Sequence, residues 1–259
     1  MWAARAMCLA KTVSRSTHTD AELAALIAEG AGQVLLGVGH AGLLDRRLLG
    51  DVGDAMAQAW ISQVLRRRRP RDAVLSEEAD DDLARLGAER VWIVDPLDGS
   101  SEFAMGTTHW AVHVALTIDG APAASAVSLP AQGRLFRSDE VPQVGGELTG
   151  RIAVSRYGHS FPSAAAADRL GLQAVHIGSA GAKAMAVVSG EVDAYVHAGG
   201  QYEWDNCAPV GVAQAAGLHC SRLNGDELAY NNPQPYLPDF VICRKEIADD
   251  LLDAVAHRW

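Results

Sequence analysis

The most regular pattern in the chain is a series of apolar residues that recur every three or four positions from Leu23 to Leu35. This spacing places them on one face of a helix. Thr19 precedes the series and Glu22 lies three residues further on, which is the arrangement of a capping box. We therefore expect a helix that begins just after Thr19.

A second helical pattern covers residues 54–68 and ends before Pro70, because proline cannot continue a helix. The basic run from Arg66 to Arg69 could be a phosphate-binding patch, but it better suits the end of that helix, where cations face its negative pole. Runs of apolar and β-branched residues then predict several strands. The expected strands are 73–76, 91–94, 110–118, 123–129 and 134–137.

Residues 138–150 are polar and contain one proline and three glycines, so we place a seam between two subdomains there. Beyond it, strands alternate with helices, which predicts an α/β second half. The expected strands are 152–155, 175–178, 193–197 and 241–244, and the expected helices are 180–189, 206–216 and 247–257. The chain is thus divided into a flexible tail (1–18), an N-terminal α+β subdomain (19–145) and a C-terminal α/β subdomain (151–259).

Composition narrows the functional classes. The chain has 259 residues and a formal net charge of −10, which argues against a protein that coats nucleic acid through a basic face. No run of 18 apolar residues predicts a membrane span. The four cysteines show no CxxC pairing or zinc spacing, so we expect reduced thiols in a cytoplasmic protein. They are Cys8, Cys207, Cys220 and Cys243.

The strand expected at 91–94 runs directly into Asp95 and Asp98, followed by Gly99 and Ser100. Two carboxylates at a strand end can hold hard divalent cations such as Mg²⁺, and the glycine leaves backbone N–H groups open to an anion. A cation and an anion cradle together suggest phosphate chemistry.

Further acids stand at the ends of other expected elements: Asp54 and Asp205 open helices, and Glu77 and Glu78 follow a strand. Taken alone, each has a structural explanation. The two aspartates could be helix caps, and the glutamates could belong to a solvated acidic loop. Asp95 before proline could likewise be a turn residue. A structural reason for both Asp95 and Asp98 is harder to find.

Three segments resemble the inositol monophosphatase superfamily of lithium-sensitive, Mg²⁺-dependent phosphatases. They are Asp-Pro-Leu-Asp-Gly-Ser at 95–100, Ser-Glu-Glu at 76–78 and Trp-Asp-Asn-Cys-Ala-Pro at 204–209. Their order and spacing are those of the family, and the resemblance extends from about residue 20 to the C-terminus. It implies a layered α-β-α-β-α sandwich of two subdomains, as in fructose-1,6-bisphosphatase, with a metal site in the cleft between them.

Within the superfamily, Glu102-Phe103, the loop 178–183 and residues 202–209 are most similar to the CysQ-type branch, which hydrolyses 3′-phosphoadenosine 5′-phosphate (PAP). The chain also departs from the family pattern. Ser100 replaces the usual threonine, which keeps the hydroxyl oxygen but fixes its rotamer less. Gly53 precedes Asp54 where threonine or alanine is common, and residues 39–50 are unusual.

The resemblance also implies roles. Two or three Mg²⁺ ions would be held by Glu77, Asp95, the Leu97 carbonyl, Asp98 and Asp205. Two such metals stabilise the entering and leaving oxygens of an in-line displacement. Ser100, oriented by Asp54, would position the attacking water, and Glu78 would orient the ligands around the metals.

The resemblance also implies which residues contact the substrate. They are Asp98, Gly99, Ser100, Ser179, Lys183, Tyr202 and Asp205. Lys183 is either a ligand of a second phosphate or a solvated helix lysine. Tyr202 either lines a base pocket or packs against neighbours. His109, His113 and His197 show no ligand spacing and are expected to be structural.

The expected function is therefore hydrolysis of PAP to AMP and phosphate, a step linked to sulfate assimilation and sensitive to lithium. The alternatives are an inositol-1-phosphatase, a fructose-1,6-bisphosphatase or a broad phosphatase of the same family. A catalytically silent regulator is disfavoured because all four metal carboxylates are present. The expected partner is a small phosphorylated molecule, without a nucleic acid polymer or a membrane. A homodimer would follow family habit.

Overall fold

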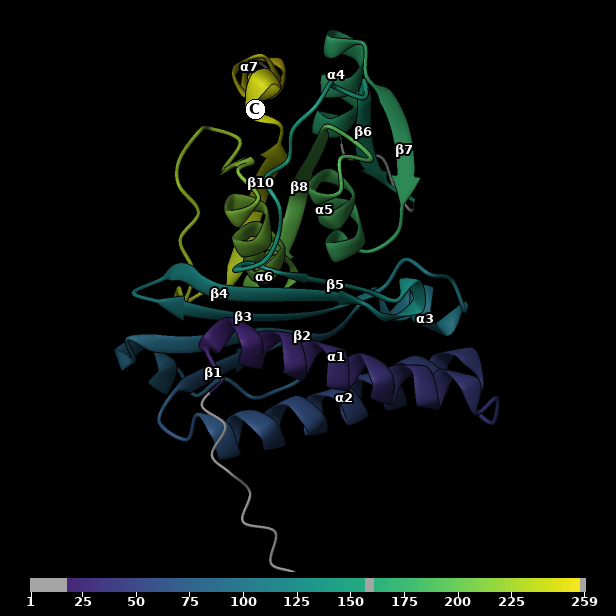
Figure 1. The fold of residues 1–259 in the computed structure, drawn as a ribbon, viewed down its shortest axis with the longest axis vertical. Coiled ribbons are helices and arrows are strands. Elements are labelled where there is room, and N and C mark those ends of the chain that lie inside the picture. Colours follow the sequence, from purple (N-terminus) through teal and green to yellow (C-terminus); the bar gives the residue numbers. More distant parts are fainter. Residues whose placement is uncertain (1–17, 157–160, 257–259) are drawn as a thin grey trace, which may run out of the picture.

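The computed structural model describes residues 18–156 and 161–256 and consists of five layers (Figure 1). Helices α1 and α2 lie along one face of a five-stranded sheet with the order β1-β2-β3-β4-β5. Helices α5 and α6 lie between this sheet and a second one, with the order β7-β6-β8-β10-β9. Helices α4 and α7 cover the outer face of the second sheet. The expected α-β-α-β-α sandwich is confirmed.

The elements before the segment 138–150 are α1 (Asp20–His40), α2 (Arg46–Arg68), β1 (Ala73–Ser76), η1 (Ala84–Gly87), β2 (Arg90–Asp98), α3 (Ser100–Ala104), β3 (Ala111–Ile118), β4 (Ala121–Leu129), η2 (Pro130–Gln132) and β5 (Arg134–Arg137). Those after it are β6 (Arg151–Ser155), α4 (Phe161–Leu170), β7 (Gln173–Ile177), α5 (Ala180–Val188), β8 (Ala194–Tyr202), α6 (Glu203–Ala215), β9 (His219–Ser221), β10 (Tyr236–Cys243), η3 (Lys245–Ile247) and α7 (Ala248–Ala256). The division into subdomains at the intervening segment stays a prediction.

Helix α1 begins with the expected capping box, in which Thr19 and Glu22 exchange backbone and side-chain hydrogen bonds. Its apolar face packs against β3 and β4. By length and composition alone this helix could cross a membrane, since one of its 18-residue windows has a mean hydropathy of 1.4. Half of that window is buried inside the fold, as in the core helix of a globular domain.

Helix α2 corrects the prediction for Asp54. The helix begins at Arg46, with the Asp45 carboxylate capping the backbone N–H of Leu48, so Asp54 lies in its interior and does not open it. The irregular-looking segment 39–50 therefore contains the end of α1, a short turn and the first turn of α2.

Other boundaries also differ from the prediction. β2 extends through Asp98, so Asp95 lies within a strand rather than a turn. Helix α6 begins at Glu203, which places Asp205 within its first turn rather than at its opening. Helix α4 and strand β9 were not expected from the sequence pattern.

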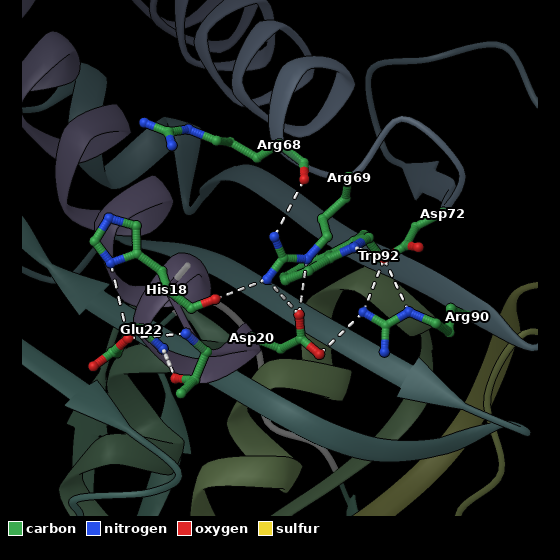
Figure 2. A network of polar contacts seen from close by, with 9 residues as sticks. His18, Asp20, Glu22, Arg68, Arg69, Asp72, Arg90 and Trp92 are labelled. Atoms are coloured by element: carbon green, nitrogen blue, oxygen red, sulfur yellow. Dashed lines mark hydrogen bonds and ion pairs between the residues drawn. The ribbon is translucent and has the colours of Figure 1, made fainter. Parts of the chain in front are cut away.

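A polar network ties the start of α1 to the end of α2 and to β2 (Figure 2). Arg69 caps α2 and donates hydrogen bonds to the Asp20 carboxylate and to the His18 carbonyl. Arg90 contacts Asp20 at 3.0 Å and also bonds Asp72. As expected, Arg66, Arg67 and Arg68 form the last turn of α2.

Two apolar cores hold the first sheet in place. One lies between this sheet and helices α1 and α2, and Trp92, Ile27 and Leu35 are fully enclosed in it. The other lies between the two sheets around α5 and α6. The free thiols of Cys207 and Cys243 are buried and that of Cys220 is partly buried, whereas Cys8 and the remainder of the segment 1–17 lie outside the described residues.

Candidate active site

The last residues of β2 place two carboxylates at the edge between the layers. Asp95 and Asp98 are both buried, and the pairing of β2 with β3 shifts register between them. The Asp95 carboxylate accepts the backbone N–H of Leu97 at 2.9 Å, which fixes its side chain. Gly99 then has a φ of +86°, a conformation that glycine adopts without strain, and the chain turns into α3.

A cavity of about 220 Å³ opens at this point. Its walls come from α2, the chain after β1, the β2–α3 junction, the loop before α5 and the first turn of α6. The lining residues are Asp54, Glu77, Asp95, Leu97, Asp98, Gly99, Ser100, Ser101, Glu102, Gly178, Ser179 and Asp205. Carboxylate oxygens of Asp95, Asp98 and Asp205 lie within 4.8 Å of one another.

Burial and mutual repulsion shape the electrostatics of this cluster. Burial, followed by the charge of Asp98, raises the pKa of Asp95 well above its usual value. Burial is also the main reason that the pKa of Glu77 rises to about 7 and that of Asp205 to about 6. So many crowded carboxylates hold their negative charge easily only beside a cation.

The donor chemistry of the cavity fits a hard divalent cation. Carboxylates and a backbone carbonyl are the ligands that Mg²⁺ prefers. In addition, Oδ1 of Asp54 is buried without a hydrogen-bond partner among the described residues. Burial, together with the charges of Glu78 and Glu77, raises the pKa of Asp54 to about 8.

Asp98 behaves differently because it has donors on several sides. Its carboxylate accepts the backbone N–H groups of Ala180 at 3.1 Å and Gly181 at 2.6 Å, at the start of α5. Nε2 of His113 lies 3.2 Å away. Burial, the largest single influence, raises the pKa of Asp98, but the charge and hydrogen bond of His113, the Gly181 N–H and the charge of Lys183 together outweigh it and hold the pKa below its usual value. Asp98 thus connects the first sheet to a helix of the second half.

The sequence pattern of the inositol monophosphatase family matches residues 50–257. The chain belongs to the inositol monophosphatase family.

Three known proteins are similar to this chain in sequence or in fold. The chain is 51% identical to the 3′-phosphoadenosine 5′-phosphate phosphatase of Mycobacterium leprae, over 93% of this chain and 95% of the relative. It is 30% identical to the 3′(2′),5′-bisphosphate nucleotidase CysQ of Escherichia coli, over 71% and 80% of the two chains. In fold it is similar to the crystal structure of CysQ from Bacteroides thetaiotaomicron, with a TM-score of 0.76, 24% identity and coverage of 89% and 98%.

Most of the site residues that the sequence predicted for this inositol monophosphatase family member line the same cavity. The five proposed metal ligands all line it, as do Asp54, Gly99, Ser100 and Ser179. Glu78 does not line the cavity, although its charge acts on Asp54 and Glu77.

Lys183 and Tyr202 lie outside the cavity wall. Lys183 is 5% exposed, so it is not a solvated helix lysine. Its ammonium group donates to the Gly178 carbonyl and lies 5.2 Å from the centre of the Tyr195 ring. Burial lowers the pKa of Lys183 to about 8. Tyr202 is 47% exposed and stacks on Trp204, which is a packing contact.

Sequence reasoning did not find two residues beside the site. His113 was expected to be merely structural, yet it lies against Asp98 and donates Nδ1–H to the Trp204 carbonyl at 3.1 Å. Arg156 follows β6 and contacts Glu102, which lines the cavity. No local pattern marks either residue, because both contacts cross between segments far apart in the chain.

Proposed function

We propose that this protein is a Mg²⁺-dependent phosphomonoesterase that removes the 3′-phosphate of 3′-phosphoadenosine 5′-phosphate and releases AMP. The observation that carries the proposal is the 51% identity, over nearly the whole of both chains, to a relative named for that reaction. The complete set of acids in one cavity supports it, since a silent relative would tolerate the loss of a metal carboxylate.

Glu77, Asp95, the Leu97 carbonyl, Asp98 and Asp205 are the proposed ligands of two or three Mg²⁺ ions. The ions would supply positive charge to the entering and leaving oxygens and would make water more acidic. Lithium inhibition, by competition for one of these sites, is part of the same proposal.

The remaining residues orient the reactants. Gly99 lets the backbone approach the phosphate closely, where a Cβ atom would lie 2.9 Å from Cβ of Ser179. Ser100 holds the attacking water through its hydroxyl oxygen. In this proposal, Oγ of Ser100 takes a proton from the water and gives its own proton to the ionised Asp54, whose buried Oδ1 has no hydrogen-bond partner among the described residues. Glu78 adds negative charge around Asp54 and Glu77.

The proposed setting is the cytoplasm, where removal of PAP would serve sulfate assimilation. Inositol-1-phosphate and fructose-1,6-bisphosphate remain alternative substrates, because the acids and the Gly99–Ser100 turn recognise only a phosphate group and its ester oxygen. Ser179 and the wall beside it have to supply the selectivity.

The test is phosphate release with Mg²⁺ from PAP, inositol-1-phosphate and fructose-1,6-bisphosphate, compared by kcat/KM. A preference for PAP of about tenfold or more, with loss of activity in EDTA, supports the proposal. Equal rates would identify a broad phosphatase, and a preference for another substrate would reject the assignment. No turnover of any substrate, despite nucleotide binding by calorimetry, would favour a silent regulator.

A further inference from the structure

Arg156 stands directly after β6, beside the wall of the cavity. One of its guanidinium nitrogens donates to Nδ1 of His109 at 2.8 Å, and another lies 3.6 Å from Oε2 of Glu102. Glu102 itself lines the cavity, and the His109 carbonyl accepts the backbone N–H of Ser179, another wall residue, at 3.1 Å. Both partners of Arg156 therefore belong to the same side of the site.

The charges around the cavity make this position unusual. Among the described residues that line the cavity, every charged side chain is an acid. Lys183 is enclosed behind Gly178, whereas the side chain of Arg156 is 35% exposed. A substrate with a single phosphate needs only the cations among the acids, but a second phosphate on the same molecule needs a positive group elsewhere.

We propose that Arg156 binds the second, non-reacting phosphate of a nucleoside bisphosphate and so sets the preference for bisphosphates over monophosphates. This inference rests on the proposed function of the same site. A guanidinium suits the task because its planar fork binds two phosphate oxygens at once. His109 accepts one Arg156 N–H through an unprotonated Nδ1, and burial and then Arg156 lower the pKa of His109, which keeps the ring neutral.

Glu102 is the positioning residue for Arg156. Its carboxylate is buried, accepts the hydroxyl of Thr107 and leaves Oε1 without a described partner. It therefore holds the guanidinium against the wall by charge. If Arg156 were removed, an unpaired carboxylate would face the incoming dianion, so the loss would include repulsion as well as a missing contact.

The experiment compares kcat/KM for PAP and for adenosine 3′-monophosphate, which differ only in the 5′-phosphate. The variants are Arg156→Ala, Arg156→Lys and, as a matched control at the other end of β6, the exposed Arg151→Ala. We expect Arg156→Ala to reduce the PAP to adenosine 3′-monophosphate ratio by about tenfold or more, mainly through KM. Arg156→Lys keeps part of the ratio, and Arg151→Ala keeps all of it.

A double variant, Arg156→Ala with Glu102→Gln, removes both charges and is expected to recover part of the lost ratio, which a purely structural role of Arg156 would not produce. The inference is overturned if Arg156→Ala keeps the wild-type ratio, or if it loses activity on both nucleotides equally. Failure of the wild-type enzyme to hydrolyse PAP at all would instead reject the proposed function, so the two failures are distinguishable.

Discussion

Nε2 of His113 lies 3.2 Å from Oδ2 of Asp98, and its other ring nitrogen donates to the Trp204 carbonyl. Both side chains are buried. Burial, the largest single influence, lowers the pKa of His113, but the charge and hydrogen bond of Asp98, the Trp204 carbonyl and the charge of Asp205 together outweigh it and hold that pKa above its usual value. From its place on β3, the imidazole therefore joins Asp98 at the end of β2 to the first turn of α6.

Replacing His113 by alanine leaves the Asp98 carboxylate without its buried partner. Breaking one side of a buried ion pair is costly, so we expect the free energy of unfolding of the metal-free protein to fall by about 3 kcal/mol. Urea unfolding in EDTA measures this. Unchanged stability of His113→Ala would show that the pair contributes nothing.

Asp95→Asn separates stability from activity. The substitution removes one charge from a repelling cluster, so the metal-free protein should melt at a higher temperature than the wild type. Activity should fall by more than the roughly 10- to 100-fold that loss of a group supporting a metal ligand costs. Calorimetry should also detect weaker Mg²⁺ binding. The exposed Asp82→Asn serves as the control, and normal turnover by Asp95→Asn would refute the proposed ligand role.

Gly181 allows α5 to begin against Asp98. A Cβ atom there would overlap Nε2 of His113 and lie 2.9 Å from Cβ of Ala111. Gly181→Ala should therefore destabilise the protein by about 1–3 kcal/mol and reduce activity, because Asp98 must shift.

Gly37 in α1 provides the control, because an added Cβ atom there would meet no neighbour within 4 Å. Gly37→Ala should be neutral or stabilising by up to about 1 kcal/mol. Chemical denaturation tests both, and equal effects would contradict the steric argument.

Asp20 makes the free energy of unfolding depend on pH in the acidic range. Partial burial raises its pKa, but the bonds from Arg69 and Arg90 outweigh this and hold the pKa below its usual value (Figure 2). Its contribution to stability is therefore complete above the pKa of the unfolded chain and is lost as the pH falls through the lower pKa of the folded state.

Asp20→Asn should accordingly cost about 1 kcal/mol at neutral pH. The difference from wild type should shrink as the pH is lowered to about 3 and below. Urea unfolding across this range measures it, with the exposed Glu29→Gln on the same helix as the control. A difference that is constant with pH would exclude the ion pairs as its source.

The sequence predicts features that depend on neighbouring residues better than those that depend on contacts between segments far apart in the chain. Asp95, Asp98 and Gly99 form a local pattern, and their place at a strand end was predictable from neighbouring residues. The convergence of Glu77 and Asp205 on the same cavity came only from the family resemblance, because their contacts cross between the layers. Asp54 lines the cavity with the other proposed site residues, but it was predicted at a helix start, since the true cap, Asp45, lies in the unusual segment 39–50.

The residues that were missed depend on long-range packing. His113 meets Trp204 across 91 positions of sequence, and Arg156 meets His109 across 47. Lys183 shows the same limit, because lysine is rarely buried and nothing in its sequence neighbourhood indicates that it would be. Only the assembled layers decide which of these polar side chains face the cleft.

The core around α5 and α6 takes side chains from both sheets, including Ile93 from the first and Phe240 from the second. Separating layers that share one core costs much free energy, because it would expose that apolar surface to water. Substrate and products are therefore not expected to enter or leave by separation of the two sheets. We therefore expect product release to depend on the residues that line the cavity, such as Gly99 and Ser179, rather than on movements of the sheets.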